Sequence, residues 1–412
     1  MACIVQKFGG TSVGSVDRIR NVARHALRAR AAGHSVVLVV SAMAGETNRL
    51  LDLVRAVAPS PSEREQDVVL ATGEQVAVGL LALAIQAEGG EATSFLGHQI
   101  RIVTDAVHGK ARIQHIDAGA LDQTLRAGRV AVVAGFQGTD EAGNITTLGR
   151  GGSDTTAVAL AAALHADACE IYTDVLGVYT ADPNVCPAAR KLDRIAYEEM
   201  LELASLGAKV LQIRSVEFAM KYRVPLWVKS SFVEDPGTLV CAEDAAMEQV
   251  VVSGIAHDRN EARLTLREVP DRPGVAARIF GALAEHHVVV DIIVQTAARS
   301  GRSDLSFTVT KADFATAREA MAEVAAELGI AAVESDDQIA KVSIVGVGMR
   351  NHAGVAARMF QVLAAEGVNI QMISTSEIKV SCVIHEKYTE LAVRSLHTAF
   401  GLDAEASAGV RG

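Results

Sequence analysis

The sequence predicts an α/β protein in which a mainly parallel sheet, covered by helices on both faces, is followed by two small ferredoxin-like modules of βαββαβ order. Half of the 412 residues are hydrophobic but only 4% are aromatic, which is typical of helices packed on a buried sheet rather than of a β-sandwich. Short β-branched runs alternate with longer helical stretches up to about residue 240, and a repeated unit follows. The length exceeds what one core usually supports, so we expect two or three domains.

The alternating part contains the strands and helices of a parallel sheet. Short apolar runs predict strands at residues 2–5, 36–40, 130–134 and 226–228. Stretches with helical spacing include residues 17–32, 67–88 and 153–165. Strands that alternate with helices imply a mainly parallel sheet, and ligand sites in such folds lie where strands end in glycine loops. We expect this domain to span residues 1–245.

The C-terminal part contains an internal repeat. The heptapeptide GVAARIF at residues 274–280 recurs as GVAARMF at residues 354–360. In each copy a strand, a glycine turn, a helix and a second strand follow one another, which is typical of ferredoxin-like modules. The elements predicted from this pattern are 262–266, 288–294 and a helix at 314–328 in the first copy, and 342–347 and 368–373 in the second. We expect the two modules at residues 262–338 and 341–408.

Charge and composition exclude several classes of function. A formal net charge of −10 argues against a nucleic-acid or membrane partner, because both surfaces need clustered positive charge. The N-terminus lacks a basic-then-apolar targeting pattern, and the apolar runs are too short to span a bilayer. The five cysteines are scattered and have no CxxC spacing, so we expect free thiols and no metal site. These features predict a soluble, cytoplasmic protein.

The first motif is KFGGTSVG at residues 7–14, between a predicted strand and a helix. Glycines at such a junction let backbone N–H groups approach an anion closely, and a helix N-terminus adds favourable dipole charge. Lys7 could then neutralise a transferring phosphoryl group. Taken alone, the motif also fits a plain turn with a solvated lysine. It matches neither a Walker A loop nor a dinucleotide-binding GxGxxG.

The second motif is TLGRGGSD at residues 147–154, which opens an alanine-rich helix. It combines an anion-cradling glycine loop, an arginine suited to bidentate carboxylate binding, and a carboxylate that could organise a lysine or a metal. An ordinary loop needs none of these. Weaker segments are SAMAGETN at residues 41–48, Gly73 with Glu74, and TDVLGVYTADP at residues 173–183. Most of these segments follow predicted strands, so one sheet edge would gather them, as phosphoryl transfer requires.

Four strings in this order resemble aspartate kinases, a family of the amino-acid kinase superfamily with a carbamate-kinase-like fold: KFGGTSVG, GRGGSD, YTDVLGVYTADP and ASLGAKVL. The resemblance covers essentially the whole chain, because the repeated unit is similar to the paired ACT domains of that family. It implies ATP-dependent phosphorylation of the β-carboxylate of L-aspartate to 4-phospho-L-aspartate, the first step of lysine, threonine and methionine biosynthesis.

The resemblance also implies roles for individual residues. Lys7 would stabilise the transferring phosphoryl group, and Asp154 would orient Lys7. The residues implied to hold ATP are Lys7, Phe8, Gly9, Gly10, Thr173, Asp174, Tyr179, Asp182, Lys209 and Val210. Those implied to bind aspartate are Ser41, Thr47, Glu74, Arg150 and Ser153, with Arg150 taking a carboxylate and Glu74 the α-ammonium. Mg²⁺ would be held mainly by the nucleotide phosphates. Family members often have Arg where this chain has Asn184, which removes one candidate charged contact to phosphate.

The repeated modules imply regulation. ACT pairs bind amino acids at their mutual interface, and lysine and threonine are the effectors that the resemblance implies; a plain dimerisation domain is the alternative. The candidate effector residues are Asp271, Gly274, Val275, Ala276, Gln295, Asn369, Ile370, Ser376 and Glu377. The chain would form a homo-oligomer or assemble with a shorter regulatory chain that starts near Met247.

Three other functions fit parts of the sequence. A glutamate-type amino-acid kinase shares the phosphoryl-transfer motifs, but the ACT pair and the string ASLGAK favour aspartate. A catalytically silent amino-acid sensor would not need Lys7, Arg150 and Asp154. A nicotinamide dehydrogenase would need a glycine fingerprint that the chain lacks. Lysine alone, threonine alone and both together are the candidate inhibitors.

Overall fold

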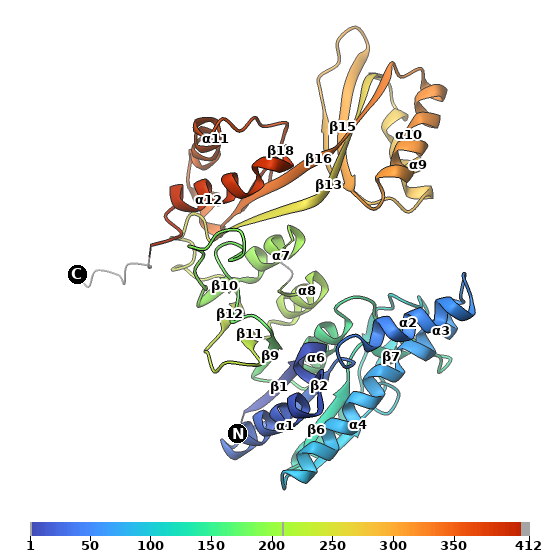
Figure 1. Cartoon of the computed structure of the whole chain (residues 1–412), viewed down its shortest axis with the longest axis vertical. Coiled ribbons are helices and arrows are strands. Elements are labelled where there is room, and N and C mark those ends of the chain that lie inside the picture. The colour runs from blue at the N-terminus through green and yellow to red at the C-terminus, as the bar shows by residue number, and fades with distance from the viewer. Residues whose placement is uncertain (1, 208–209, 405–412) are drawn as a thin grey trace, which may run out of the picture. The chain divides into compact units, whose positions relative to one another are not determined.

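The computed structural model describes residues 2–207 and 210–404 and divides into two compact units (Figure 1). The N-terminal unit comprises Met1–Val178, Lys191–Ser205 and Lys209–Met247. The C-terminal unit comprises Tyr179–Arg190, Leu206–Ala208 and Glu248–Gly412. The short segment Tyr179–Arg190 therefore belongs to the C-terminal unit although the chain on both sides of it belongs to the other.

An eight-stranded sheet forms the centre of the N-terminal unit, in the order β10-β12-β11-β9-β1-β2-β6-β3. The six neighbouring strands from β11 to β3 are parallel, whereas β12 runs antiparallel to β11. Because the chain goes from the central β1 to β2 on one side and later to β9 on the other, ligands are expected at the carboxyl end of β1. The strands are β1 (Cys3–Phe8), β2 (Ser35–Val40), β3 (Ala92–Phe95), β6 (Val130–Ala134), β9 (Ala168–Thr173), β10 (Arg194–Ala196), β11 (Leu226–Ser230) and β12 (Thr238–Cys241).

Helices cover both faces of this sheet. On one face α1 (Val16–Ala31) and α4 (Thr72–Ala87) lie side by side (Figure 1) and share a core with Phe8, Leu38 and Val132. On the opposite face α6 (Gly152–Ala163) packs on β1 and against α8 (Ile213–Tyr222). Since side chains alternate along a strand, Phe8 faces α1 and α4 while Lys7 faces α6. The other helices are η1 (Gly10–Val13), α2 (Glu46–Val57), α3 (Glu63–Leu70), α5 (Gly119–Arg126) and α7 (Tyr197–Ser205).

A small second sheet in the same unit has the order β5-β4-β7-β8. Its strands β7 and β8 form a hairpin, and β8 ends directly before the glycine-rich loop at residues 148–152. This sheet therefore delivers that loop to the start of α6. The strands are β4 (Val103–Thr104), β5 (Ile113–His115), β7 (Gln137–Thr139) and β8 (Ile145–Thr147).

The C-terminal unit contains both repeats on one six-stranded sheet, β14-β15-β13-β16-β18-β17. The long strands β13 (Gly254–Pro270) and β16 (Ala332–Val345) run through both modules (Figure 1). Residues 254–258 of β13 pair with residues 341–345, so a strand that precedes the first module in the chain completes the sheet of the second. The other elements are α9 (Val275–Glu285), β14 (Val290–Gln295), β15 (Arg302–Thr310), α10 (Phe314–Leu328), η2 (Val347–Asn351), α11 (Val355–Ala365), β17 (Met372–Thr375), β18 (Lys379–His385), η3 (Glu386–Tyr388) and α12 (Thr389–Ala399).

The repeated heptapeptides occupy equivalent places. Gly274 and Gly354 have φ values of 93° and 90° and precede helices of 11 residues each. The left-handed backbone at both positions favours glycine. The predicted α/β fold with two ferredoxin-like modules is thus confirmed.

The segment Tyr179–Arg190 is packed into the second module. Ala181, Val185 and Cys186 join a core that includes Met359 and Leu396. Ile255 N donates to Thr180 O at 2.8 Å, and Arg394 Nε donates to Val185 O at 2.7 Å. The segment is therefore held by backbone and side chains of the C-terminal unit.

Three predicted elements differ from the structure. The strand expected at residues 368–373 begins only at Met372, and the strand expected at residues 262–266 is part of the longer β13. The helix expected at residues 67–88 is split into α3 and α4 at Ala71, whose carbonyl accepts from Gln137 Nε2 at 3.0 Å. The combined stretch Glu63–Ala87 is long and apolar enough to cross a membrane by composition alone, but half of its apolar window is buried. Its packing on α1 and β6 explains it as a core helix. Of the five free cysteines, Cys169, Cys186 and Cys382 are buried, whereas Cys3 and Cys241 are only partly buried.

Candidate active site

The carboxyl ends of four neighbouring parallel strands carry the candidate site. Phe8 at the end of β1 is in register with Val40 of β2 and Tyr172 of β9, and Val40 is in register with Ala134 of β6. The segments that follow these residues contain most of the motifs predicted from the sequence. The parallel register therefore brings these motifs to one edge of the sheet.

A buried ion pair lies at the centre of this edge. Lys7 Nζ is 2.6 Å from Asp154 Oδ1, and the side chains are 12% and 11% exposed. Lys7 reaches Asp154 because it points to the α6 face of β1, and Asp154 lies in the first turn of α6. A carboxylate there is favoured by the helix dipole, and it holds the ammonium group of Lys7 at the strand end.

The glycines after Lys7 allow close backbone packing. A Cβ atom on Gly10 would lie 2.8 Å from Ala42 O, and one on Gly9 would lie 3.5 Å from Lys7 Nζ. Gly10 begins the short helix η1, and Ser12 N donates to Gly9 O at 2.9 Å. A side chain at Gly10 would push η1 away from the end of β2. The backbone of the glycine turn is thus held next to the Lys7 ammonium.

Glu74 is a buried carboxylate on the other side of the edge. It lies in the first turn of α4, and its Oε1 accepts from Ala42 N at 2.9 Å, whereas its buried Oε2 has no hydrogen-bond partner among the described residues. Burial raises the pKa of Glu74 from 4.5 to about 7. Such a group needs a cationic or donor partner to remain ionised in the folded state.

Ser41 and Thr47 belong to the segment that packs on this turn of α4. Gly73 comes so close to Ala42 that a Cβ on it would lie 2.8 Å from Ala42 Cβ, and 3.6 Å from Glu46 Cγ. Ser41 N donates to Phe8 O at 3.2 Å. These contacts place residues 41–47 between the end of β1 and the start of α4.

The glycine-rich loop before α6 carries Arg150 and Ser153. Ser153 is buried against Gly135, where a Cβ would lie 2.6 Å from Ser153 Oγ. Arg150 is exposed and makes no hydrogen bond or ion pair with the residues that the structure describes. The loop thus offers a guanidinium with no partner among the described residues, close in the chain to Asp154.

The predicted nucleotide residues fall in both units. Thr173 and Asp174 follow β9, and Thr173 Oγ1 donates to Asp174 Oδ1 at 3.1 Å. Phe8 stacks on Tyr172 with ring centroids 4.5 Å apart, and Val210 is partly buried in the N-terminal unit. Tyr179 and Asp182 belong to the C-terminal unit, where Asn184 N donates to Asp182 Oδ1 at 2.9 Å. Lys209 lies outside the described residues.

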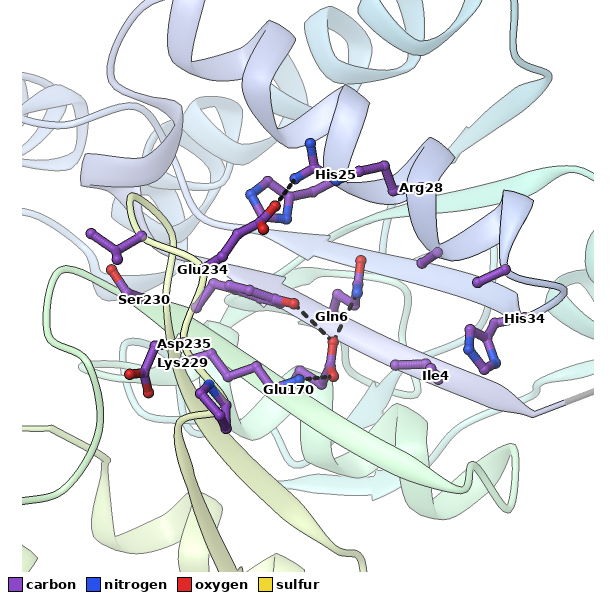
Figure 2. Close-up of a pocket in the computed structure, with 15 residues that line it drawn as sticks. Ile4, Gln6, His25, Arg28, His34, Glu170, Lys229, Ser230, Glu234 and Asp235 are labelled. Atoms are coloured by element: carbon purple, nitrogen blue, oxygen red, sulfur yellow. Dashed lines mark hydrogen bonds and ion pairs between the residues drawn. The ribbon is translucent and has the colours of Figure 1, made fainter. Parts of the chain in front are cut away.

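A polar cluster that the sequence did not predict lies on the α1 face of the sheet (Figure 2). Gln6 Nε2, Tyr172 OH and Lys229 Nζ surround the Glu170 carboxylate at 2.8, 3.1 and 2.5 Å. The cluster lines a cavity of about 510 Å³ whose wall includes Arg28. Polar residues inside three apolar strands were the available signal, but only the register, which pairs Gln6 with Glu170, shows that they meet.

The C-terminal unit has a separate cavity of about 410 Å³ in its first module. The predicted effector residues that line it are Asp271, Gly274, Val275, Ala276 and Gln295. Asn369, Ile370, Ser376 and Glu377 lie instead around β17 in the second module, where Glu377 Oε2 is 3.6 Å from Arg350 Nε. The structure thus divides the predicted effector residues between the two modules.

Comparisons with known proteins bear on this site. Residues 2–230 match the amino acid kinase family, and residues 264–327 and 342–400 each match an ACT domain. The chain is 61% identical to an aspartokinase of Pseudomonas aeruginosa over 99% of this chain and 100% of that protein.

Solved structures of similar fold include two of E. coli aspartokinase III, one in complex with aspartate and ADP and one with lysine and aspartate. Both are 29% identical to this chain, with TM-scores of 0.79 and 0.78. The matches cover 96% and 97% of this chain and 99% of each of those chains.

Proposed function

This chain belongs to the aspartokinases of the amino acid kinase family, and we propose that it transfers the γ-phosphoryl group of ATP to the β-carboxylate of L-aspartate. The observation that carries the proposal is the Lys7–Asp154 ion pair beside the glycine turn at the end of β1. The product is 4-phospho-L-aspartate, which enters the synthesis of lysine, threonine and methionine.

On the nucleotide side, Lys7 neutralises charge on the transferring phosphoryl group. Asp154 holds the Lys7 ammonium in place, so that no reorganisation is needed as charge shifts between the reacting oxygens. The backbone of Gly9 and Gly10 lies against the phosphates. The other proposed ATP contacts are Phe8, Thr173, Asp174, Tyr179, Asp182, Lys209 and Val210.

On the acceptor side, Glu74 binds the α-ammonium of aspartate and Arg150 binds a carboxylate. The buried Oε2 of Glu74, which has no partner in the described part of the chain, supports the first assignment, because an ammonium would complete its hydrogen bonds. The guanidinium of Arg150, which no described residue pairs with, suits a bidentate contact to a carboxylate. Ser41, Thr47 and Ser153 are the remaining proposed contacts.

ATP would act as its Mg²⁺ complex. Mg²⁺ keeps several water ligands and usually binds through phosphates and one or two carboxylates. Among the described residues there is no group of three His, Cys, Asp or Glu side chains that could hold a metal ion. We therefore assign the ion mainly to the nucleotide phosphates, where it would neutralise the charge of the leaving group.

The test is ADP release with L-aspartate and with L-glutamate as acceptor. We expect turnover with L-aspartate and a loss of turnover in Lys7→Ala, while binding of lysine or threonine to the C-terminal unit stays measurable. A clear preference for L-glutamate would contradict the acceptor. Undiminished turnover in Lys7→Ala would contradict the role of Lys7.

Feedback control is assigned to the C-terminal unit, with lysine and threonine as effectors. The cavity lined by residues 271–276 and Gln295 is a suitable place for the α-amino and α-carboxylate groups of an effector, because the N-terminus of α9 adjoins it. A kinase assay with lysine and threonine, added separately and together, tests this assignment. Full activity under all three conditions would contradict it.

The assembly is proposed to be a homo-oligomer or a complex with a shorter regulatory chain that starts near Met247, in the cytoplasm and without nucleic acid or membrane partners. The main segment of the C-terminal unit begins at Glu248, which supports a separately made regulatory chain. Expression from the native gene, followed by mass spectrometry, tests this proposal. A single full-length product would contradict the short chain, whereas a short product that disappears in Met247→Leu would support it.

A further inference from the structure

A second buried carboxylate, that of Asp67, binds the start of the loop at residues 147–154, which carries Arg150. Asp67 in α3 is 0% exposed. Its oxygens accept from Thr147 Oγ1 at 2.5 Å, from Thr147 N at 3.0 Å and from Gly109 N at 3.0 Å, and His108 Nδ1 lies 2.9 Å away. A buried charge persists in a fold only when it is paired and hydrogen-bonded in this way. Asp67 therefore joins the end of β8 to the turn at residues 108–109.

Leu148 and Gly149, the next residues of the loop, are held by other contacts. Arg214 of α8 donates to Leu148 O at 2.8 Å and to Ala111 O at 2.9 Å. Gly149 has a φ of 75°, and a Cβ on it would lie 2.9 Å from Gly109 O. Residues 147–149 are thus fixed one after another, by side-chain donors and acceptors and by close backbone packing.

Arg150 is the first residue after this fixed stretch. Its side chain is exposed and has no partner among the described residues, so its own contacts do not orient it. The position of its backbone depends on the three residues before it. A long side chain that must meet a small carboxylate loses less entropy on binding when its Cα is already fixed.

We propose that Asp67 and Arg214 are positioning residues that fix the backbone of residues 147–149 and so place Arg150 for the carboxylate of the amino-acid substrate. The inference rests on the proposed aspartate-binding role of Arg150. Neither residue touches the substrate. Both act through the loop, so their loss affects the binding of L-aspartate and not that of ATP.

The principal test is Asp67→Asn in the full-length enzyme. The amide keeps the volume of the carboxylate but turns an NH2 group toward donors, which leaves buried N–H groups unpaired. We expect the KM for L-aspartate to rise about ten- to a hundredfold, as a misplacement of about 1 Å can cause, with the KM for ATP changed less than about twofold. Asp140→Asn is the control for the loss of a carboxylate in this region, because Asp140 accepts from Asn144 N at 2.8 Å in the turn between β7 and β8, away from residues 147–149.

A double-mutant cycle separates positioning from general destabilisation. If Asp67 acts through Arg150, then Asp67→Asn combined with Arg150→Ala has the same KM for L-aspartate as Arg150→Ala alone. An independent structural role would add the two effects. Should Asp67→Asn fail to fold, Thr147→Val and Arg214→Lys each remove part of the same support while leaving the carboxylate in place.

The possible outcomes are distinct. Unchanged KM values for L-aspartate in the Asp67, Thr147 and Arg214 variants, together with a raised value in Arg150→Ala, would overturn the inference and leave the proposed function intact. Additive effects in the cycle would also overturn it. An unchanged value in Arg150→Ala would overturn both the role of Arg150 and the inference. No L-aspartate-dependent ADP release by the unaltered enzyme would contradict the proposed function itself.

Discussion

At the scale of single residues, Glu74 links pH to substrate binding. Burial raises the pKa of Glu74 to about 7 in the absence of substrate, and only the ionised form attracts an ammonium group. As pH falls below about 7, kcat/KM for L-aspartate should therefore fall about tenfold per pH unit. Initial rates at pH 6 to 8.5 with saturating ATP check this expectation. Glu74→Gln should bind L-aspartate weakly at every pH, and the same slope in that variant would contradict the assignment.

The same residue should cost stability at high pH. The folded-state pKa of Glu74 is raised above its unfolded value of 4.5, so the fold favours the neutral acid and loses stability as pH rises from about 4.5 to 7. A pKa raised from 4.5 to about 7 corresponds to about 3 kcal/mol. Denaturant unfolding should therefore show Glu74→Gln to be more stable than the unaltered chain at pH 8, with little difference near pH 4.5. A difference that is independent of pH would contradict the argument.

A functional residue could be predicted from the sequence where the residues next to it in the chain form a recognisable motif. Lys7, Asp154 and Glu74 lie in recognisable strings next to strand and helix ends, so their types and places were predictable. Asp67 and Glu170 were missed, because their partners lie far away in the chain. Thr147 is 80 residues from Asp67, and Gln6 is 164 residues from Glu170. Such pairs depend on packing and strand register, which no local pattern encodes.

At the scale of elements, the turn into α6 depends on a glycine. Gly151 has a φ of 71°, and a Cβ on it would lie 1.8 Å from Gln212 Cγ. Gly151→Ala should therefore strain the backbone and displace the first turn of α6, which carries Ser153 and Asp154. We expect kcat to fall by an order of magnitude or more, as small misplacements of reacting groups can cause.

The control for this substitution is Gly143→Ala. Gly143 has a φ of 84°, but a Cβ on it would have no atom within 4 Å, so this variant has the backbone strain without a clash. It should lose about 1–2 kcal/mol of stability and keep its kcat. Equal kcat values in the two variants would show that the start of α6 tolerates displacement.

Elements were predicted well where periodicity is strong and less well where tertiary contacts interrupt them. The strands expected at residues 36–40, 130–134 and 226–228 and the helix expected at residues 314–328 lie near the observed bounds of β2, β6, β11 and α10. The helix at residues 67–88 was not predicted to break, because its sequence is helical throughout. At the break, the carbonyl of Ala71 accepts from Gln137 Nε2, 66 residues away in the chain, as well as from Gln75 N at 3.4 Å.

At the scale of the whole molecule, two segments fold with a module or unit that their place in the sequence does not suggest. The repeat predicted two modules, but not that residues 254–258 complete the sheet of the second one. It also did not predict that Tyr179–Arg190 folds with the C-terminal unit. Both segments have the composition of ordinary strands and turns. No local pattern therefore indicates which part of the fold they join. The segment Tyr179–Arg190 matters for function because it contains the proposed nucleotide contacts Tyr179 and Asp182.

The position of that segment should therefore affect ATP binding. Thr180 is 1% exposed, and its Oγ1 lies 2.9 Å from His397 Nε2 and accepts from Arg190 N at 2.9 Å. Thr180→Val keeps the shape but leaves these groups without a partner, at a cost of about 1–3 kcal/mol. Because the proposed ATP contacts Tyr179 and Asp182 lie on either side of Thr180 in the chain, the KM for ATP should rise several-fold. The KM for L-aspartate should stay nearly constant.

Ser343→Ala supplies the control for this prediction. Ser343 Oγ lies 2.7 Å from Ser381 Oγ in the same unit, and both residues are buried. Loss of the Ser343 hydroxyl removes a hydrogen bond of the C-terminal unit but no contact of the segment Tyr179–Arg190, so the KM for ATP should not change. If both variants raise that KM equally, general loosening of the unit and not the segment determines ATP binding. A rise only in Thr180→Val would show that ATP binding depends on the segment Tyr179–Arg190.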